Sequence, residues 1–154
     1  FLSQDEILQA WEGVQWPGRL EVISSQPLII LDGAHNPHAV APLVATMKER
    51  YGQLDKQVLF TCIQTKAIEE MLELWSGLEK SQLTLTTFED SRAYSVRDMQ
   101  ETAHLKGLPY QEWKLFLTHY LEKESQQSDL LLVTGSLYFL AQVRAFLIEK
   151  ISRR

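Results

Sequence analysis

The chain has 154 residues, 45% of them hydrophobic and 23% charged, which is enough apolar material for the core of one domain. A formal net charge of -5 argues against a general surface for nucleic acid or for anionic membranes, so we expect neither as a partner. No apolar stretch approaches the length of a membrane span and no signal-peptide pattern opens the chain, which makes a cytoplasmic protein the simplest interpretation.

Two single residues add to these bounds. The only cysteine, Cys62, excludes an internal disulfide framework, and its apolar neighbours indicate a core residue rather than a nucleophile. The chain begins at Phe1 without an initiator Met, which hints at a fragment of something longer.

The predicted elements begin with a short lead-in and a hairpin. Residues 1–15 carry a capping-box pattern and one or two amphipathic turns, so we expect a linker there rather than core. Two apolar runs, 20–23 and 27–31, have only a short polar connection between them, which forces an antiparallel pair. A loop follows the second run, and in it Asn36 can cap a helix that starts at Pro37.

Strands and helices then alternate to the end of the chain. Apolar residues at helical spacing predict helices that begin near Pro37, Ile68, Val96, Trp113 and Leu137, and Pro42 should kink or disturb the first turn of the first one. Apolar or β-branched runs predict strands at 57–63, 82–88 and 129–134, and residues 108–110 are too short for more than a stub of strand. The alternation predicts an α/β fold, a mostly parallel sheet with one antiparallel edge strand and helices on both faces.

Two loops at the carboxyl ends of predicted strands are the candidate site. Asp32 and His35 follow one strand, Gly135 and Ser136 follow another, and ligands of open α/β sheets bind at this edge. The free N–H groups at the start of each following helix would favour a phosphate or carboxylate. The structural alternatives are that Asp32 and His35 only satisfy backbone groups of the loop and that Ser136 is a helix cap.

Three blocks of sequence, spread over nearly the whole chain, together resemble one family. They are Trp16-Pro17-Gly18-Arg19-Leu20-Glu21, Leu31-Asp32-Gly33-Ala34-His35-Asn36-Pro37 and Val133-Thr134-Gly135-Ser136-Leu137-Tyr138. In order and separation they are similar to the signatures of the C-terminal domain of folylpolyglutamate synthase/dihydrofolate synthase, in the Mur ligase superfamily. The resemblance implies a Rossmann-like sheet and places such a domain at residues 16–152.

The resemblance also implies a reaction and its partners. In this family ATP activates a folate or dihydropteroate carboxylate as an acyl phosphate, and the amine of L-glutamate then attacks to form an amide. ATP with Mg²⁺ would be bound mainly by an N-terminal P-loop ATPase domain that is absent from this chain, which contains no phosphate-loop motif and no pair of His or Cys residues at metal spacing. The isolated domain is therefore expected to be an inactive half of an ATP-dependent ligase.

Site residues are carried over position by position. Arg19 and Asp32 resemble ATP contacts, and His35 and Ser136 resemble the residues that hold or orient glutamate, with His35 as the catalytic candidate. Asn36 and Arg92 are secondary candidates for the cleft. Related sequences often carry Asp-Lys-Asp near Lys66, and only the lysine is kept here, so we interpret Lys66 as a solvated loop residue.

Other functions remain open at this point. A Mur-type ligase for peptidoglycan precursors shares the fold and the His-Asn-Pro element, although the Trp-Pro-Gly-Arg and Asp-Gly-Ala-His blocks favour the folate branch. A hydrolase built on Asp32, His35 and Ser136 and a non-catalytic interaction module are the remaining classes. The sequence does not distinguish a dihydropteroate substrate from a folylpolyglutamate substrate.

Overall fold

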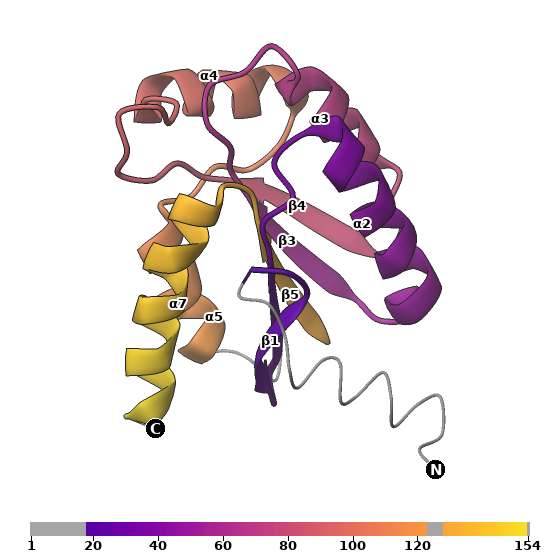
Figure 1. Ribbon diagram of the computed structural model, residues 1–154, viewed down its shortest axis with the longest axis vertical. Coiled ribbons are helices and arrows are strands. Elements are labelled where there is room, and N and C mark those ends of the chain that lie inside the picture. Colours follow the sequence, from indigo (N-terminus) through magenta and orange to yellow (C-terminus); the bar gives the residue numbers. More distant parts are fainter. Residues whose placement is uncertain (1–17, 123–127, 154) are drawn as a thin grey trace.

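The computed structural model describes residues 18–122 and 128–153, which form one five-stranded sheet between two layers of helices (Figure 1). The lead-in predicted at residues 1–15 and the Trp16-Pro17 dipeptide lie outside the described residues. The strand order is β1-β2-β5-β3-β4, and the strands are β1 (Glu21–Ser25), β2 (Leu28–Asp32), β3 (Lys56–Phe60), β4 (Ser81–Leu85) and β5 (Leu130–Thr134). Only the β1–β2 pair is antiparallel among these strands, which confirms a mostly parallel α/β sheet with one antiparallel edge strand.

The helices divide between the two faces of the sheet. They are α2 (Pro37–Tyr51), α3 (Ile68–Ser76), α4 (Val96–Lys106), α5 (Trp113–Glu122) and α7 (Leu137–Ser152). One core cluster joins the sheet to α2, α3 and α4, and a second cluster joins it to α5 and α7. Figure 1 shows the same division, which confirms helices on both faces.

Strand periodicity explains why there are two cores. On β2, Ile30 belongs to the α2/α3/α4 core, whereas Ile29 and Leu31 belong to the α5/α7 core. Successive side chains of a strand point to opposite faces, so a strand covered on both sides must be apolar throughout. The Leu-Leu-Leu-Val run of β5 follows the same rule, because Leu130 and Leu132 lie in one core and Leu131 and Val133 in the other.

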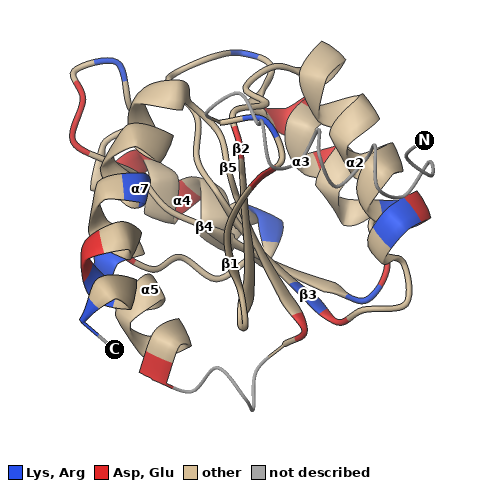
Figure 2. Cartoon of the chain, turned by 60° about the horizontal axis from the view of Figure 1, so that its bottom comes forward, with Lys and Arg blue, Asp and Glu red and all other residues tan. Residues whose placement is uncertain are grey.

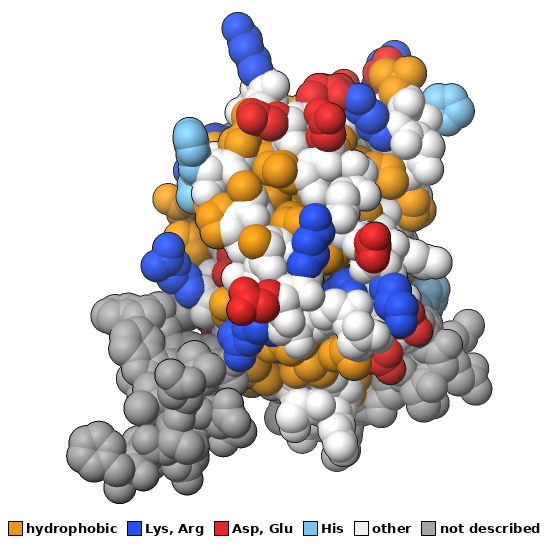
Figure 3. Space-filling model, turned by 90° about the vertical axis from the view of Figure 1, so that its right-hand side faces the viewer, with side chains coloured by type: hydrophobic (Ala, Val, Ile, Leu, Met, Phe, Trp, Pro, Cys, Tyr) orange, Lys and Arg blue, Asp and Glu red, His pale blue; other side chains and the backbone are white. Residues whose placement is uncertain are grey.

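Charged residues surround this framework. Figure 2 shows Lys, Arg, Asp and Glu mainly on the helices and the loops rather than on the central strands. The face toward the viewer in Figure 3 carries basic and acidic side chains scattered among hydrophobic ones. No helix within the described ranges is long and apolar enough to cross a membrane.

Two predicted strands are shorter than their apolar patterns. β3 ends at Phe60 rather than at residue 63, and β4 ends at Leu85 rather than at residue 88. The Thr61 N–H still donates to the Thr134 carbonyl over 3.3 Å and the Thr86 N–H to the Phe60 carbonyl over 3.0 Å, and beyond these residues the chain leaves the sheet ladder. Ile63 forms an isolated antiparallel bridge with Ala93, and the Gln64 N–H donates to the Arg92 carbonyl over 2.8 Å.

Three further local predictions concern residues 108–110, Cys62 and Pro42. Tyr110 forms a single bridge with Leu85, so the predicted stub of strand at 108–110 is confirmed. Cys62 is fully buried in the α2/α3/α4 core, which confirms a core residue, and burial raises the pKa of its thiol to about 12. α2 runs from Pro37 to Tyr51 with Pro42 inside it, so the helix continues past the position where a disturbance was expected.

Candidate functional site

The three sequence blocks meet at the carboxyl end of the central strands. β2 and β5 run parallel in a register that places Asp32 opposite Thr134. The Gly135 N–H donates to the Asp32 carbonyl over 3.3 Å, and the Gly33 N–H donates to the Gly18 carbonyl over 2.6 Å. Segments from the start, the first loop and the far end of the chain therefore form one surface, at the edge where open α/β sheets bind ligands.

Asp32 fixes the backbone on both sides of this surface. Its Oδ2 accepts from the Leu20 N–H over 3.0 Å, and its Oδ1 accepts from the Ala34 N–H over 2.9 Å. Burial raises the pKa of Asp32 above its ordinary value, and these two hydrogen bonds and the charge of Arg19 oppose that rise. Asp32 therefore does bind backbone N–H groups of the loop, which was the structural alternative to a ligand site. Each of its carboxylate oxygens keeps a further lone pair for a ligand.

Arg19 is presented by a strained turn. Gly18 has φ +80° and Leu20 has φ +43°, which is a rare backbone conformation for a leucine. The Leu20 N–H is held by Asp32, and the Gly18 N–H donates to Glu21 Oε1 over 3.0 Å. Anchored on both sides, the turn leaves Arg19 exposed and close enough for its charge to lower the pKa of Asp32.

His35 and Asn36 occupy the exposed end of the loop after β2. His35 Nδ1 lies 2.9 Å from the Gly33 carbonyl, and because a carbonyl can only accept, Nδ1 carries the proton. In the neutral ring Nε2 then holds the free lone pair. Asn36 is the predicted cap of α2, since its Oδ1 accepts from the Ala39 N–H over 2.9 Å.

Ser136 caps the helix that starts beside this loop. Its Oγ accepts from the Tyr138 N–H over 3.2 Å, and only 5% of the residue is exposed. The preceding residue, Gly135, has φ +136°, and a Cβ atom there would lie 2.0 Å from the Thr61 carbonyl oxygen. Only glycine fits at that position, so the cap is set by a close approach between the ends of β5 and β3.

The hydrolase alternative needs a hydroxyl activated by a base. Within the described residues the structure gives no hydrogen bond between Ser136 and His35. Ser136 instead accepts from its own helix, and His35 contacts its own loop, so the arrangement lacks the nucleophile–base pair of a hydrolase.

Arg92 reaches the same surface from the loop after β4. Its Nε and one terminal nitrogen donate to the two carboxylate oxygens of Asp90 over 2.9 and 2.8 Å, and its Cζ lies 4.0 Å from the ring centroid of Tyr138. The paired guanidinium lowers the pKa of Asp90 to about 2, and the carboxylate raises the pKa of Arg92. The structure therefore brings Arg92 next to the helix that Ser136 caps.

Two features of this surface were not expected from the sequence. Leu137 and Tyr138 are 54% and 58% exposed, which makes them an apolar border of the site rather than the start of a buried helix face. Their place directly after a helix cap was the available signal, since the first turn of a helix at a sheet edge can remain uncovered. The second unexpected feature is Thr61, whose buried Oγ1 has no hydrogen-bond partner among the described residues.

The described residues do not build a metal site. Across 18–122 and 128–153, no three His, Cys, Asp or Glu side chains gather closely enough to hold a metal ion.

Comparison with known proteins gives the family. The model of the Mur ligase, glutamate ligase domain matches residues 18–137. The chain belongs to this family. The matched range contains all the candidate site residues named above, from Arg19 through Asp32 and His35 to Ser136.

Relatives of this glutamate ligase domain are folate enzymes. The dihydrofolate synthase/folylpolyglutamate synthase of Bacillus subtilis (strain 168) is 29% identical over 143 residues, which cover 93% of this chain and 33% of that protein. A folylpolyglutamate synthase from Lacticaseibacillus casei is 42% identical over 52 residues, which cover 34% of this chain and 12% of that protein. The chain is thus homologous to the C-terminal domain of such enzymes.

Solved structures agree with the sequence comparison. The ligand-free bifunctional folylpolyglutamate synthase/dihydrofolate synthase of Yersinia pestis has a TM-score of 0.69 and 28% identity, covering 96% of this chain and 35% of that chain. The same enzyme complexed with AMPPNP and Mn ion has a TM-score of 0.66 and 27% identity, with the same coverage. This glutamate ligase domain therefore spans about a third of the length of these relatives.

Proposed function

We propose that this chain is the C-terminal half of the active site of an ATP-dependent folate–glutamate ligase, acting in a longer protein. The observation that carries the proposal is the convergence of the Arg19 turn, the Asp32 loop and the Ser136 cap on one surface of a glutamate ligase domain. In such a reaction a folate or dihydropteroate carboxylate is activated as an acyl phosphate, and the amine of glutamate then displaces the phosphate.

The nucleotide side of the surface consists of Arg19 and Asp32. The exposed guanidinium of Arg19 is suited to binding phosphate oxygens in pairs. The carboxylate of Asp32 can accept a ribose hydroxyl or a base amine with the lone pairs that its two backbone hydrogen bonds leave free. Asp32 thus combines a structural role with a ligand role.

The glutamate side consists of His35 and Ser136, with Asn36 and Arg92 at its border. The contact between His35 Nδ1 and the Gly33 carbonyl leaves Nε2 available to accept a proton from the ammonium group of glutamate. Ser136 places the first N–H groups of α7 toward an anionic group, which suits a glutamate carboxylate.

The remaining parts belong to the longer protein. An N-terminal P-loop ATPase domain would bind ATP with Mg²⁺, and residues 16–152 would close against it. Positioning and charge stabilisation then require both domains, so the isolated chain should not turn over.

The test measures ADP release by the full-length parent protein. With ATP, a folate substrate and glutamate present, His35→Ala should lower turnover by about 10²-fold or more, because a positioned proton acceptor is lost. Asp32→Ala should also suppress turnover, and its thermal unfolding must be measured because Asp32 holds the loop. His119→Ala, an exposed histidine in the last turn of α5, is the matched control and should retain full activity.

Three outcomes would reject the proposal. Turnover unchanged by His35→Ala would make the loop after β2 purely structural. Turnover with a peptidoglycan precursor in place of folate would assign the chain to the Mur-type ligases. A parent protein that needs neither nucleotide nor glutamate would leave only a non-catalytic interaction module.

A further inference from the structure

Arg144 on α7 forms an ion pair with Glu21 at the start of β1. One terminal nitrogen of its guanidinium donates to Glu21 Oε1 over 2.5 Å, and its Nε lies 3.2 Å from both carboxylate oxygens. Only 27% of the Arg144 side chain and 19% of the Glu21 side chain are exposed. A guanidinium that contacts a carboxylate through two nitrogens, partly shielded from water, fixes the orientation of both groups.

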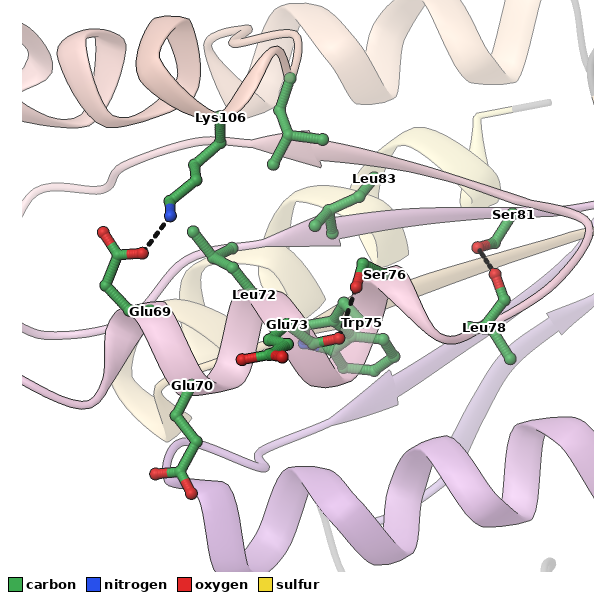
Figure 4. Close-up of a pocket in the computed structure, with 11 residues that line it drawn as sticks. Glu69, Glu70, Leu72, Glu73, Trp75, Ser76, Leu78, Ser81, Leu83 and Lys106 are labelled. Carbon is green, nitrogen blue, oxygen red and sulfur yellow. Dashed lines mark hydrogen bonds and ion pairs between the residues drawn. The ribbon is translucent and has the colours of Figure 1, made fainter.

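Two other ion pairs are more exposed than this one. Lys106 and Glu69 pair across the groove drawn in Figure 4, with 40% and 62% of their side chains exposed. Arg153 and Glu149 pair at the end of α7, with 70% and 60% exposed. Exposed ion pairs contribute little to stability, so the Arg144–Glu21 pair is the one of these three that is suited to holding a backbone in place.

The Glu21 carboxylate also holds the turn that presents Arg19. Its Oε1 accepts from the Gly18 N–H over 3.0 Å, in addition to the hydrogen bonds from Arg144. Gly18 and Leu20, on the two sides of Arg19, have φ +80° and φ +43°. Backbone in such rare conformations persists only where its surroundings hold it, so the turn depends on a fixed Glu21 carboxylate.

α7 supports the same turn at a second point. A Cβ atom at Gly18 would lie 2.7 Å from Leu137 Cδ2, and one at Gly33 would lie 2.4 Å from the same atom. Leu137 therefore packs directly on the backbone of both segments. Because Leu137 and Arg144 are seven residues apart, they lie on one face of the helix, and this face backs the turn.

We propose that Arg144 is a positioning residue for nucleotide binding, which acts through Glu21 on the turn at residues 18–20 and so directs the guanidinium of Arg19. The inference rests on the proposed function, in which Arg19 binds phosphate oxygens. Arg144 acts through Glu21 rather than on the ligand, because the carboxylate engages its Nε and one terminal nitrogen. Without Arg144, Arg19 keeps its charge but samples more positions, so nucleotide binding weakens more than the chemical step does.

The experiment uses the full-length parent protein. It measures the dissociation constant of AMPPNP by titration calorimetry, together with KM for ATP and kcat for ADP release. Arg144→Met should raise the dissociation constant and KM about fivefold while kcat changes less than about twofold. Arg153→Met removes an exposed ion pair at the end of the same helix and should leave all three quantities unchanged. A merely structural role of Arg144 would instead lower the active fraction, and with it kcat, at an unchanged dissociation constant.

Double variants test whether Arg144 acts through the turn. With Arg19→Ala or Glu21→Ala already present, adding Arg144→Met should change the dissociation constant of AMPPNP by less than about twofold, because the path to the ligand is then already broken. A fivefold effect that persists beside Arg19→Ala, or an equal loss of affinity in Arg153→Met, would overturn the inference.

Arg19→Ala alone separates the two possible failures. If Arg19→Ala weakens AMPPNP binding and Arg144→Met does not, the inference fails and the proposed function stands. If Arg19→Ala leaves AMPPNP binding unchanged, the nucleotide role of Arg19 in the proposed function is wrong, and the inference fails with it.

Discussion

The loop after β2 and the loop after β5 lie side by side, yet they are held in different ways. In the first loop, polar side chains hold the backbone, since Asp32 accepts two N–H groups and Asn36 caps α2. In the second loop, a steric constraint adds to the Ser136 cap of α7, because Gly135 has φ +136° and lies directly against the Thr61 carbonyl. We therefore expect changes at Gly135 to affect folding first and changes in the first loop to affect ligands as well.

The sharpest way to break this comparison is Gly135→Ala. The new Cβ would combine a strained backbone with a clash against the Thr61 carbonyl, and we expect a loss of about 3 kcal/mol or more in the free energy of unfolding. Gly107→Ala is the control, because Gly107 has φ +66° with no atom within 4 Å of the added carbon, so strain alone should cost about 1 kcal/mol. Urea unfolding of both variants measures the difference, and equal losses would show that the close approach has no energetic weight.

The next largest effect is expected for Asp32→Asn. An amide keeps one acceptor but turns its NH₂ group toward the other backbone N–H, which should cost about 2 kcal/mol at neutral pH. Urea unfolding measures this loss, and Glu101→Gln on the exposed side of α4 is the control.

Acidification tests the burial of Asp32 separately. Because burial raises the pKa of Asp32 above 3.8, the folded wild type binds a proton more readily than the unfolded chain. The wild type should therefore gain stability relative to the Asp32→Asn variant as the pH falls through the raised pKa, with the gain complete below 3.8. Urea unfolding of both proteins between about pH 7 and pH 4 measures this difference in the free energy of unfolding. A difference that became smaller on acidification would contradict the prediction.

Features set by local residue types could be predicted from the sequence, whereas features set by distant contacts could not. Asn36, Pro37 and Ser136 carry their cap chemistry in their residue types, so both helix starts were predictable. The ends of β3 and β4 were not, because Ile63 and Phe88 are buried or half-buried by contacts outside the sheet. An apolar pattern records burial without recording which partner provides it.

The candidate site divides in the same way. The loops of Asp32 and Ser136 were predictable as neighbours because parallel strands end at one edge of a sheet. The contact of Arg92 with Tyr138 depends on how the loop after β4 folds back onto α7, and no local pattern encodes that. The sequence block Leu137-Tyr138 marked the position, and only the structure shows that these side chains are exposed.

A smaller effect separates the two helix caps. Ser136 is almost fully buried, so water cannot replace its hydroxyl, and Ser136→Ala should cost about 1.5 kcal/mol. Asn36 is exposed, and Asn36→Ala should cost only about 0.5 kcal/mol, since water can reach the freed N–H. Thermal unfolding of the two single variants compares the losses, and a larger loss for Asn36→Ala would contradict the expectation that the buried cap contributes more stability than the exposed one.

The last expected effect has the opposite sign. Thr61 is fully buried beside Gly135 and its Oγ1 has no partner among the described residues, so Thr61→Val should raise the free energy of unfolding by about 1 kcal/mol by removing an unpaired polar group. Thr134→Val is the matched control, because the equally buried Thr134 Oγ1 lies 3.5 Å from the Ala34 carbonyl and loses that contact. Urea unfolding should therefore show a higher free energy of unfolding for Thr61→Val and a lower one for Thr134→Val, each relative to the wild type. If Thr61→Val destabilised the chain as much as Thr134→Val, the hydroxyl of Thr61 would have a partner at the sheet edge, and the contact between Thr61 and Gly135 would be polar as well as steric.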